Sequence, residues 1–434
     1  MKRKCLAIGI ILLFVGTCIT PTIAQDTEKP LPTSRGNWLY VGGSGPGNYT
    51  TIQDAINDSS DGDTVYVYDD SSPYYEHVII KQGINLIGES TSTTILNGSG
   101  TGTIILLNAS NVTITNFTLR DAQYCISNPW PTLGGKNNIF MRLKIENLNW
   151  AFGIFLHSIV IDNEIAYCTV SNCSTGIHLG AADDLIKEGN KIHHNTIFNN
   201  YDGICLTGSG STCLIYNNTI QNNTHGVWIL SPFHIFSNNT ITKNQNGVIL
   251  AVGAEPGGVY TIIEDNIFKE NYEGLRVISD ANVVTRNLFE GNDRGIMLSV
   301  SEYETYCSVE NNQIQRNIFL ENKIGLILGP PKNEFGLEFL RVADNNITSN
   351  NFIDNRIQAL CCDRNYWDNN YWDDWIGLHV DACSVIPKFI LGATPLFIKL
   401  FLRYGLPFPN IFYFPRISCD WHPAQESYDI SGMK

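Results

Sequence analysis

Residues 195–206 read NTIFNNYDGICL, and this segment is the first of six copies of one phrase. Each copy has Asn, four residues, a second Asn, two residues, Gly, and then a triplet that is apolar at its first and third positions. The glycines of the six copies are Gly203, Gly226, Gly247, Gly274, Gly295 and Gly325. They lie 21 to 30 residues apart, and this period with constant internal spacing indicates stacked structural repeats.

The triplet after each glycine has the alternation of a β-strand. Its outer residues are always large and aliphatic, as in Ile204 and Leu206, so we expect them to face inward. The middle residue ranges from Trp228 to Arg276, so we expect it to face solvent. A second short strand is predicted between the two asparagines, with these inward residues: Ile197, Ile220, Ile241, Phe268, Phe289 and Phe319.

Three short strands and three turns fill a repeat and leave no room for an amphipathic helix of 10–15 residues. The predicted fold is therefore all-β, a parallel β-helix whose coils pair with one another at ~4.8 Å. We expect the glycines to supply a positive φ at tight corners. We expect each Asn to bond to the equivalent Asn of the next coil, which would form a ladder.

The rest of the chain divides around this repeat. Residues 1–24 have the charged start, apolar run and small-residue cleavage site of a signal peptide, and residues 25–36 look like a linker. The β-helix is predicted over 37–362, and Thr51–Asn57 has the spacing of a short helix that could cap its first coil. Residues 363–434 are predicted to form a C-terminal cap. The apolar segment 385–414 is broken by Pro, Lys and Arg, so we expect it to fold over the last coil rather than span a membrane.

Several segments resemble the opening of right-handed parallel β-helix proteins of the pectin-lyase-like superfamily. They are Tyr49–Ile56, Gly62–Val65, Tyr75-Glu76 and Ile84–Glu89. The Asn/Gly coils and the segment Asn365-Tyr366-Trp367 resemble its NosD-like branch of surface and periplasmic proteins. The resemblance covers residues 37–375 and implies a right-handed coil. It does not imply one activity, because the fold hosts both enzymes and non-enzymes.

Charge and cysteines restrict the partners. The formal net charge is −14 and there is no basic stripe, so nucleic acid is excluded and an anionic polysaccharide is disfavoured. A secreted, cell-surface or periplasmic protein can form disulfides. Cys361, Cys362, Cys383 and Cys419 could staple the tail, or the 12 cysteines could be buried thiols. No CxxC motif exists, and no cofactor is predicted.

The middle residues of the triplets form an outward stripe: His178, Cys205, Trp228, Ile249, Arg276, Met297 and Ile327. This stripe has no carboxylate, and its His and Arg lie about four coils, or roughly 19 Å, apart. Superfamily lyases need acidic calcium ligands with a base, and hydrolases need neighbouring carboxylates. No catalytic residue is therefore predicted.

The longer repeats place their extra residues after the triplet, where they could wall a groove with acidic rims. Their only adjacent carboxylates are Asp183 and Asp184. The candidate carbohydrate-binding residues are Trp228, His178, Arg276, Asp183, Asp184, Trp367 and Trp372. His193 and His194 could bind copper, as the NosD resemblance suggests, but neighbours on a strand point to opposite faces, so no metal site is predicted.

Three functions remain open. The first is a secreted or cell-surface protein that is structural or binds a polysaccharide or cell-surface glycan without catalysis. The absence of carboxylates from the outward stripe favours this function. The second is a polysaccharide lyase or glycoside hydrolase with catalytic residues on the long loops. The third is a NosD-like factor in metal-centre maturation. The oligomeric state is not predicted.

Overall fold

The structure is a computed structural model. It describes residues 36–129, 135–148, 150–158, 160–181, 189–208, 212–251, 258–300, 308–329, 341–361, 363–375, 379–380, 383–384, 388–391 and 417–430. The expected signal peptide, the linker up to residue 35, and most of the long insertions, including Asp183 and Asp184, lie outside these residues. The main compact unit of the chain begins at Gly36.

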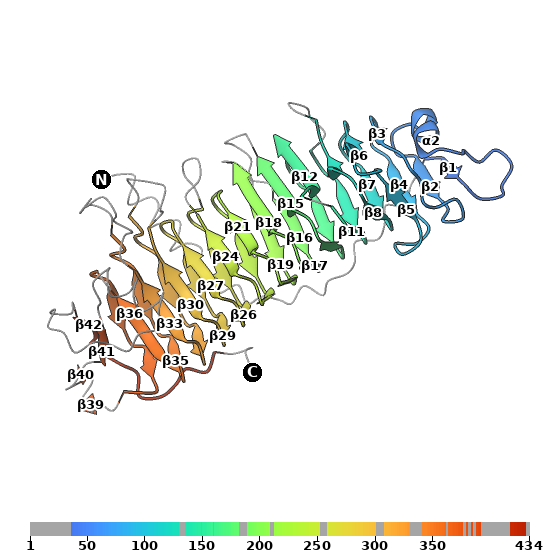
Figure 1. Cartoon of the computed structure of the whole chain (residues 1–434). Coiled ribbons are helices and arrows are strands. Elements are labelled where there is room, and N and C mark those ends of the chain that lie inside the picture. Colours follow the sequence, from blue (N-terminus) through green and yellow to red (C-terminus); the bar gives the residue numbers. More distant parts are fainter. Residues whose placement is uncertain are drawn as a thin grey trace, which may run out of the picture. The chain divides into compact units, whose positions relative to one another are not determined.

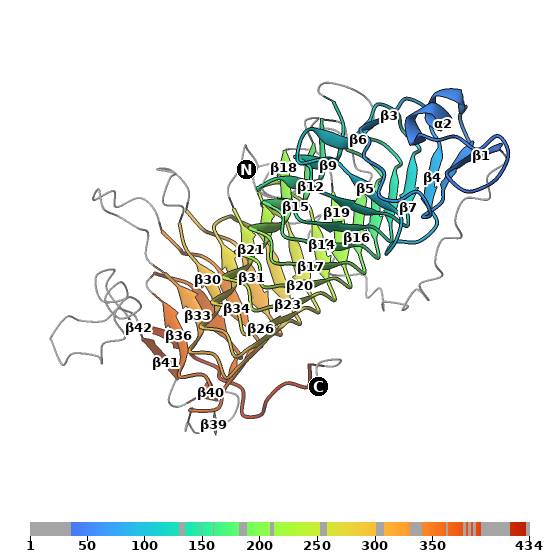
Figure 2. The same cartoon turned by 45° about the vertical axis from the view of Figure 1, so that its right-hand side comes forward.

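Stacked coils of three short strands form the described part of this unit (Figures 1 and 2). After the first two coils, which contribute no strand to the second sheet, each coil contributes one strand to each of three sheets, here named A, B and C. Equivalent strands of successive coils pair in parallel. The predicted parallel β-helix is therefore confirmed.

Sheet A receives the first strand of each coil. Its strands are β1 (Trp38–Val41), β2 (Thr64–Val67), β4 (Asn85–Gly88), β7 (Thr113–Thr115), β10 (Ile139–Met141), β13 (Glu164–Ala166), β16 (Asn190–His193), β19 (Cys213–Tyr216), β22 (Ile235–Ser237), β25 (Ile262–Glu264), β28 (Val283–Thr285), β31 (Gln313–Gln315), β34 (Asn346–Thr348) and β37 (Tyr366–Asp368).

Sheet B lies between the two asparagines of the phrase. Its strands are β5 (Ile95–Asn97), β8 (Thr118–Arg120), β11 (Lys144–Glu146), β14 (Thr169–Ser171), β17 (Thr196–Phe198), β20 (Thr219–Gln221), β23 (Thr240–Thr242), β26 (Ile267–Lys269), β29 (Leu288–Glu290), β32 (Ile318–Leu320), β35 (Asn351–Ile353) and β38 (Tyr371–Trp372).

Sheet C contains the strand that carries the glycine and its triplet. Its strands are β3 (Val78–Ile80), β6 (Thr103–Leu107), β9 (Tyr124–Ser127), β12 (Phe152–Ser158), β15 (Thr175–Ala181), β18 (Asp202–Gly208), β21 (His225–Ile229), β24 (Asn246–Leu250), β27 (Glu273–Val277), β30 (Arg294–Leu298), β33 (Ile324–Leu328), β36 (Ile357–Cys361), β41 (Lys388–Leu391) and β42 (Ile417–Asp420).

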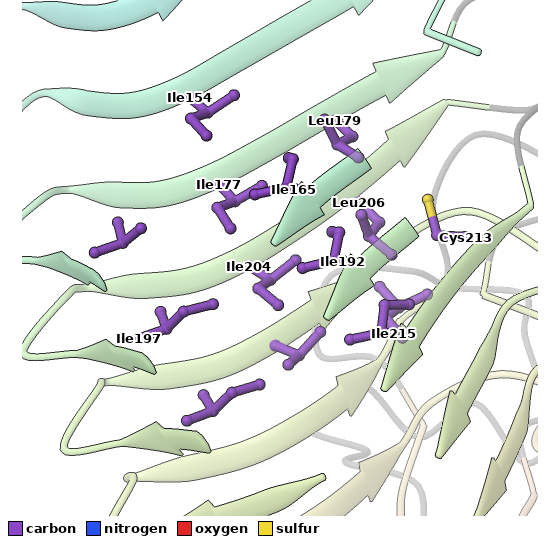
Figure 3. Packing of buried hydrophobic residues seen from close by; sticks show 14 of the residues in the cluster. Ile154, Ile165, Ile177, Leu179, Ile192, Ile197, Ile204, Leu206, Cys213 and Ile215 are labelled. Carbon is purple, nitrogen blue, oxygen red and sulfur yellow. The ribbon is translucent and has the colours of Figure 1, made fainter. Parts of the chain in front are cut away.

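The core is built from columns of equivalent side chains, as Figure 3 shows for Ile154, Ile177 and Ile204 on successive strands. The predicted inward residues of sheet B are fully buried. In the later coils they become one aromatic stack, in which Phe268, Phe289, Phe319, Phe352 and Trp372 follow one another at centroid distances of 4.2–5.2 Å. This stacking adds specific ring contacts to the apolar burial that stabilises the solenoid.

The role predicted for the repeat glycines is wrong in its physical reason. The positive φ values at the corner belong instead to the residue before each Asn, such as Asn199 (56°) and Asn222 (54°). The glycines are needed because neighbouring coils approach closely. A Cβ on Gly203 would lie 2.5 Å from the carbonyl oxygen of Gly226, and one on Gly226 would lie 2.4 Å from that of Gly247.

The first coil is capped by α2 (Ile52–Asp58), which confirms the predicted helix. Thr51 is its N-cap, and the hydroxyl of Thr51 accepts a hydrogen bond from the backbone N–H of Asp54. Ile52, Ala55 and Ile56 are buried against the opening strands. The helix therefore covers apolar core that the end of a solenoid would otherwise expose.

Near the last coil, β41 pairs with β36 in parallel, and β42 pairs with β41 in an antiparallel arrangement. β39 (His379–Val380) and β40 (Cys383–Ser384) form a small separate antiparallel pair. Cys361 and Cys419 are free thiols, and Cys362, another cysteine of the predicted staple, lies outside the described residues.

Candidate functional site

The corner between sheets B and C is built on a column of buried amides. Asn223 shows the pattern, because its side-chain oxygen accepts from the backbone and side-chain nitrogens of Asn200 at 2.9 and 3.1 Å. Its own amide donates to Asn244 at 3.1 Å and to the carbonyl of Ile197 at 3.3 Å. The predicted Asn ladder is confirmed, and its bonds satisfy backbone groups that the turn leaves unpaired.

A groove of about 800 Å³ runs along this corner over five coils. The positive-φ residues form one side, and the residues after the buried column form the other. It is lined by Asn147, Leu148, Trp150, Asn172, Cys173, Ser174, Asn199, Asn200, Tyr201, Asn222, Asn223, Thr224, Lys243 and Gln245. Trp150 is 78% exposed and Tyr201 is 46% exposed, so both offer a ring to a ligand.

The lining of the groove is uncharged apart from Lys243. Lys243 lies at its C-terminal end, and its ammonium forms a long ion pair of 3.7 Å with Glu270, the equivalent residue of the next coil. From there the exposed corner positions become charged, as Asp293, Lys323 and Arg356 show. Amides, hydroxyls and two exposed rings make the groove suited to hydrogen bonding and stacking rather than to holding charge.

The outer face of sheet C borders this groove and carries two columns of side chains. One is the predicted stripe, and the other is the residue that precedes each glycine. The glycine interrupts the alternation of the strand, so the residue before the glycine and the middle residue of the triplet, three positions apart, share a face. His225 and Trp228 are an example, with their rings 5.1 Å apart. Tyr201 of the groove lies 5.2 Å from the same His225 ring.

The second column contains carboxylates that strict alternation does not place on this face. Asp202 pairs with His225, and the Asp202 Oδ1 lies 2.7 Å from the His225 Nδ1. Three coils after Asp202, Glu273 pairs with Arg294, and Arg276 of the predicted stripe lies 3.9 Å from Glu273. Each of these carboxylates therefore faces a basic partner and not a second carboxylate.

His178 and Cys205 are adjacent on the stripe and are both largely buried. Burial, with a smaller effect from His157, lowers the pKa of His178 to about 4, so its imidazole is neutral near pH 7. The His178 ring stacks on Phe155 at 4.6 Å. Burial raises the pKa of the Cys205 thiol to about 12, so the thiol stays protonated and is a poor nucleophile.

Two of the candidate sugar-binding residues need a correction. Trp367 and Trp372 are 3% and 2% exposed, so neither offers a ring face to solvent. Trp372 ends the aromatic stack on Phe352 and donates its indole N–H to Asp420 at 3.1 Å. Both rings belong to the core of the last coil, because the sheets continue through β38.

The predicted residues therefore do not form one site. Trp228 and His178 lie on the sheet C face beside the groove, while Arg276 lies further along with Glu273. Trp150, Tyr201 and the exposed asparagines were not predicted as site residues. Their one sequence signal is that the corner positions flanking the buried Asn are uncharged from Asn147 to Thr224 and mostly charged from Lys243 onward.

His193 and His194 do not point to opposite faces, contrary to the prediction. β16 ends at His193, and His194 turns the corner with φ 55°, so their Nδ1 atoms lie 2.9 Å apart. The Nε2 of His193 lies 3.3 Å from Glu164. The described residues nevertheless contain no group of three or more His, Cys, Asp or Glu side chains that could hold a metal ion.

Two family models match parts of the chain. Residues 185–329 match the family described as periplasmic copper-binding protein (NosD), and residues 39–232 match the right-handed β-helix region. A search among curated proteins found no match. Among the described residues, no helix is long and apolar enough to cross a membrane.

Solved structures share the fold at low sequence identity. The A-module of the mannuronan C-5 epimerase AlgE6 from Azotobacter vinelandii gives a TM-score of 0.54 at 14% identity, covering 73% of this chain and 92% of that one. The alginate lyase AlyF-OU02, in complex with G6, gives 0.56 at 12% identity, covering 76% and 84%. The Dettilon tailspike protein gives 0.50 at 13% identity, covering 82% and 73%. These similarities establish the right-handed parallel β-helix.

Proposed function

We propose that this protein, a right-handed parallel β-helix of the pectin-lyase-like kind, binds a neutral saccharide in the groove between sheets B and C without acting on it. The observation that carries the proposal is the pair of exposed rings, Trp150 and Tyr201, set among amides and hydroxyls in a groove whose lining is uncharged apart from Lys243. Sugar rings present apolar C–H faces for stacking and hydroxyls for hydrogen bonds, and this lining offers both partners. We place the protein outside the cytoplasm, as a secreted, cell-surface or periplasmic protein.

The carboxylates of the sheet C face support the absence of catalysis. Asp202 is paired with His225 and Glu273 with Arg294, whereas glycoside hydrolysis requires two carboxylates that flank one bond. The Cys205 thiol and the His178 imidazole are held in their neutral forms by burial. Binding without turnover is the simplest function of this surface.

The test is a panel of neutral and anionic oligosaccharides in which binding and product release are both measured. We expect a neutral ligand to bind without product, and Tyr201→Ala to weaken it about tenfold, the equivalent of about 1.4 kcal/mol. Tyr366→Ala is the matched control, because Tyr366 is an exposed tyrosine of β37, far along the chain from the groove. Preference for an anionic ligand, or equal effects of the two variants, would contradict the proposal.

A lyase or hydrolase activity is the second candidate, and the Asp202–His225 pair favours it. A carboxylate that orients an imidazole is a common arrangement for a general base, and this imidazole contacts Tyr201 of the groove. Product release that is abolished by His225→Ala, with binding retained, would establish that activity and displace the first proposal.

A further inference from the structure

A cluster of aromatic side chains lies on the outer face of sheet A at its first two strands. It consists of Trp38 and Tyr40 of β1 and of Tyr66 and Tyr68 in and just after β2. We call these four residues the aromatic platform. Trp38 is 49% exposed and Tyr40 is 38% exposed, while Tyr66 and Tyr68 are half-buried beside them.

The four rings form one continuous surface. The Tyr40 ring lies 6.2 Å from the Trp38 ring and 6.1 Å from the Tyr68 ring, and it is inclined to them by only 28° and 24°. Tyr66 lies at 6.2 Å from Tyr40 and 5.1 Å from Tyr68, and its ring is edge-on to both, at 64° and 78°. The rings of Trp38, Tyr40 and Tyr68 therefore share an orientation and give a ligand stacking positions side by side, while Tyr66 supports them edge-on.

These rings are not part of the core of the first coils. Val41, Val65 and Val67 are the fully buried residues of the same two strands, and they face the interior. In later coils the outward positions of sheet A carry a mixture of polar and aliphatic residues, such as Lys191, Leu214 and Ile235. The first two strands differ from these coils in carrying four neighbouring Trp and Tyr rings.

The charges near the platform favour an uncharged ligand. β1, β2 and β4 contain no Lys or Arg. The nearest charged groups along these strands are acidic, and Glu89 and Asp69 lie close enough to raise the pKa of Tyr66 together with burial. An anionic polymer would be repelled by this rim, whereas the pyranose rings of a neutral polymer can stack without a charge partner.

We propose that the aromatic platform is a second binding site, which takes consecutive sugar rings of a neutral polysaccharide chain. The inference rests on the proposed saccharide function and extends it. The platform lies on sheet A in the first two coils, and the groove lies at the corner between sheets B and C and begins at Asn147, so the two sites share no residue. A long chain held at two sites dissociates more slowly than an oligosaccharide held at one, because the second contact is intramolecular.

The experiment compares polymer binding with oligosaccharide binding in the full chain. The polymers are amorphous cellulose, xylan and β-1,3-glucan, with alginate as the anionic comparison, and binding is measured by co-sedimentation. Each soluble hexasaccharide of the same series is titrated by calorimetry. We expect the Trp38→Ala/Tyr40→Ala variant to lose at least tenfold in affinity for a neutral polymer while its hexasaccharide affinity in the groove is unchanged.

Two controls separate binding from folding. Trp38→Phe keeps a ring and should retain most of the polymer affinity, and Trp421→Ala removes an exposed tryptophan elsewhere and should change nothing. Thermal unfolding of every variant shows whether the β1–β2 pairing survives. If the alanine variant unfolds early, the Trp38→Phe variant and the quenching of Trp38 fluorescence by polymer still decide the question.

The outcomes distinguish this inference from the proposal on which it rests. If Tyr201→Ala abolishes hexasaccharide binding but platform variants bind polymer normally, the platform inference is wrong and the groove proposal stands. Alginate binding through the platform would also overturn it. Loss of self-association or of vesicle binding in the platform variant, with polymer binding unchanged, would assign the surface to a second copy or to a membrane instead. If no neutral saccharide binds the wild type, both proposals fail.

Discussion

Two corners of the same coils are built differently. At the corner between sheets B and C, the buried column runs from Cys173 through successive asparagines to Asn355, and every step is a hydrogen bond. At the corner that leads into sheet A, a similar column runs from Asn138 to Asn190 and resumes from Asn282 to Asn365. Between these two parts stand Cys213, His234 and Thr261.

The interruption leaves polar atoms that are poorly matched to their surroundings. The side-chain hydroxyl of Thr261 is buried and has no hydrogen-bond partner among the described residues. The buried His234 ring accepts from the backbone N–H of Cys213 and contacts Ser231, and burial lowers its pKa to about 4. The strands on both sides still pair in register. The backbone pairing therefore sets the coil, and the amide column satisfies the polar groups that the corner buries.

The largest expected effect is the removal of an amide from the unbroken column. Asn271 accepts from the backbone and side chain of Asn244 and donates to Ile241 and Asn292, all within 3.1 Å. We expect Asn271→Ala to lower the free energy of unfolding by about 4 kcal/mol, because several buried groups lose their partners at once. Urea unfolding followed by circular dichroism measures this. Thr261→Ala in the interrupted column is the control and should cost under about 1 kcal/mol, and equal losses would contradict the comparison.

The next effect is a pH dependence that the interruption creates. His234 has a folded-state pKa of about 4 against an ordinary value of 6.5, so the unfolded chain takes up the proton first as the pH falls. Stability should be complete above pH 6.5 and should decline by about 3 kcal/mol between pH 6.5 and 4. His234→Asn places the usual ladder residue there and should remove this part of the decline. An unchanged pH profile in the variant would show that His234 is not its source.

A third column of buried asparagines lies at the corner between sheets A and B, and mutation can test which groups stabilise its C-terminal end. Its last amide, Asn370, donates from both its backbone and side chain to Asp420 Oδ2, each at 3.0 Å. We expect Asp420→Leu to lower the free energy of unfolding by about 2 kcal/mol, since Asn370 and Trp372 lose a buried acceptor. Asp420→Asn retains an acceptor oxygen and should cost less. If both variants cost the same, the carboxylate charge is what matters, and not the hydrogen bonds.

The smallest effect should be stabilising. Thr261→Val removes the unpartnered buried hydroxyl and keeps the shape of the side chain, so we expect a gain of about 1 kcal/mol in the free energy of unfolding. Thr240→Val at an exposed strand position should have little effect and serves as the control. A loss of stability at position 261 would mean that the hydroxyl has a partner in solution.

The sequence determined the fold because the fold is periodic. The two asparagine positions and the glycine recur at constant spacing in six copies, so three short strands per coil, the inward columns and the ladder could all be predicted from residue type and position. The column at the corner that leads into sheet A escaped prediction because Cys213, His234 and Thr261 interrupt it in the middle of the repeat.

Only the tertiary structure decided where the exposed chemistry meets. Asp202 and His225 lie on the outer face of sheet C because the glycine disrupts the strict alternation that the sequence prediction assumed. His193 and His194 came together because a corner, and not a strand, follows His193. Trp150 and Tyr201 line one groove because coils stack, which brings equivalent residues one or two repeats apart in the chain within roughly 5 to 10 Å. A single repeat determines which residues face inward, whereas contacts between coils determine which outward residues can bind one ligand.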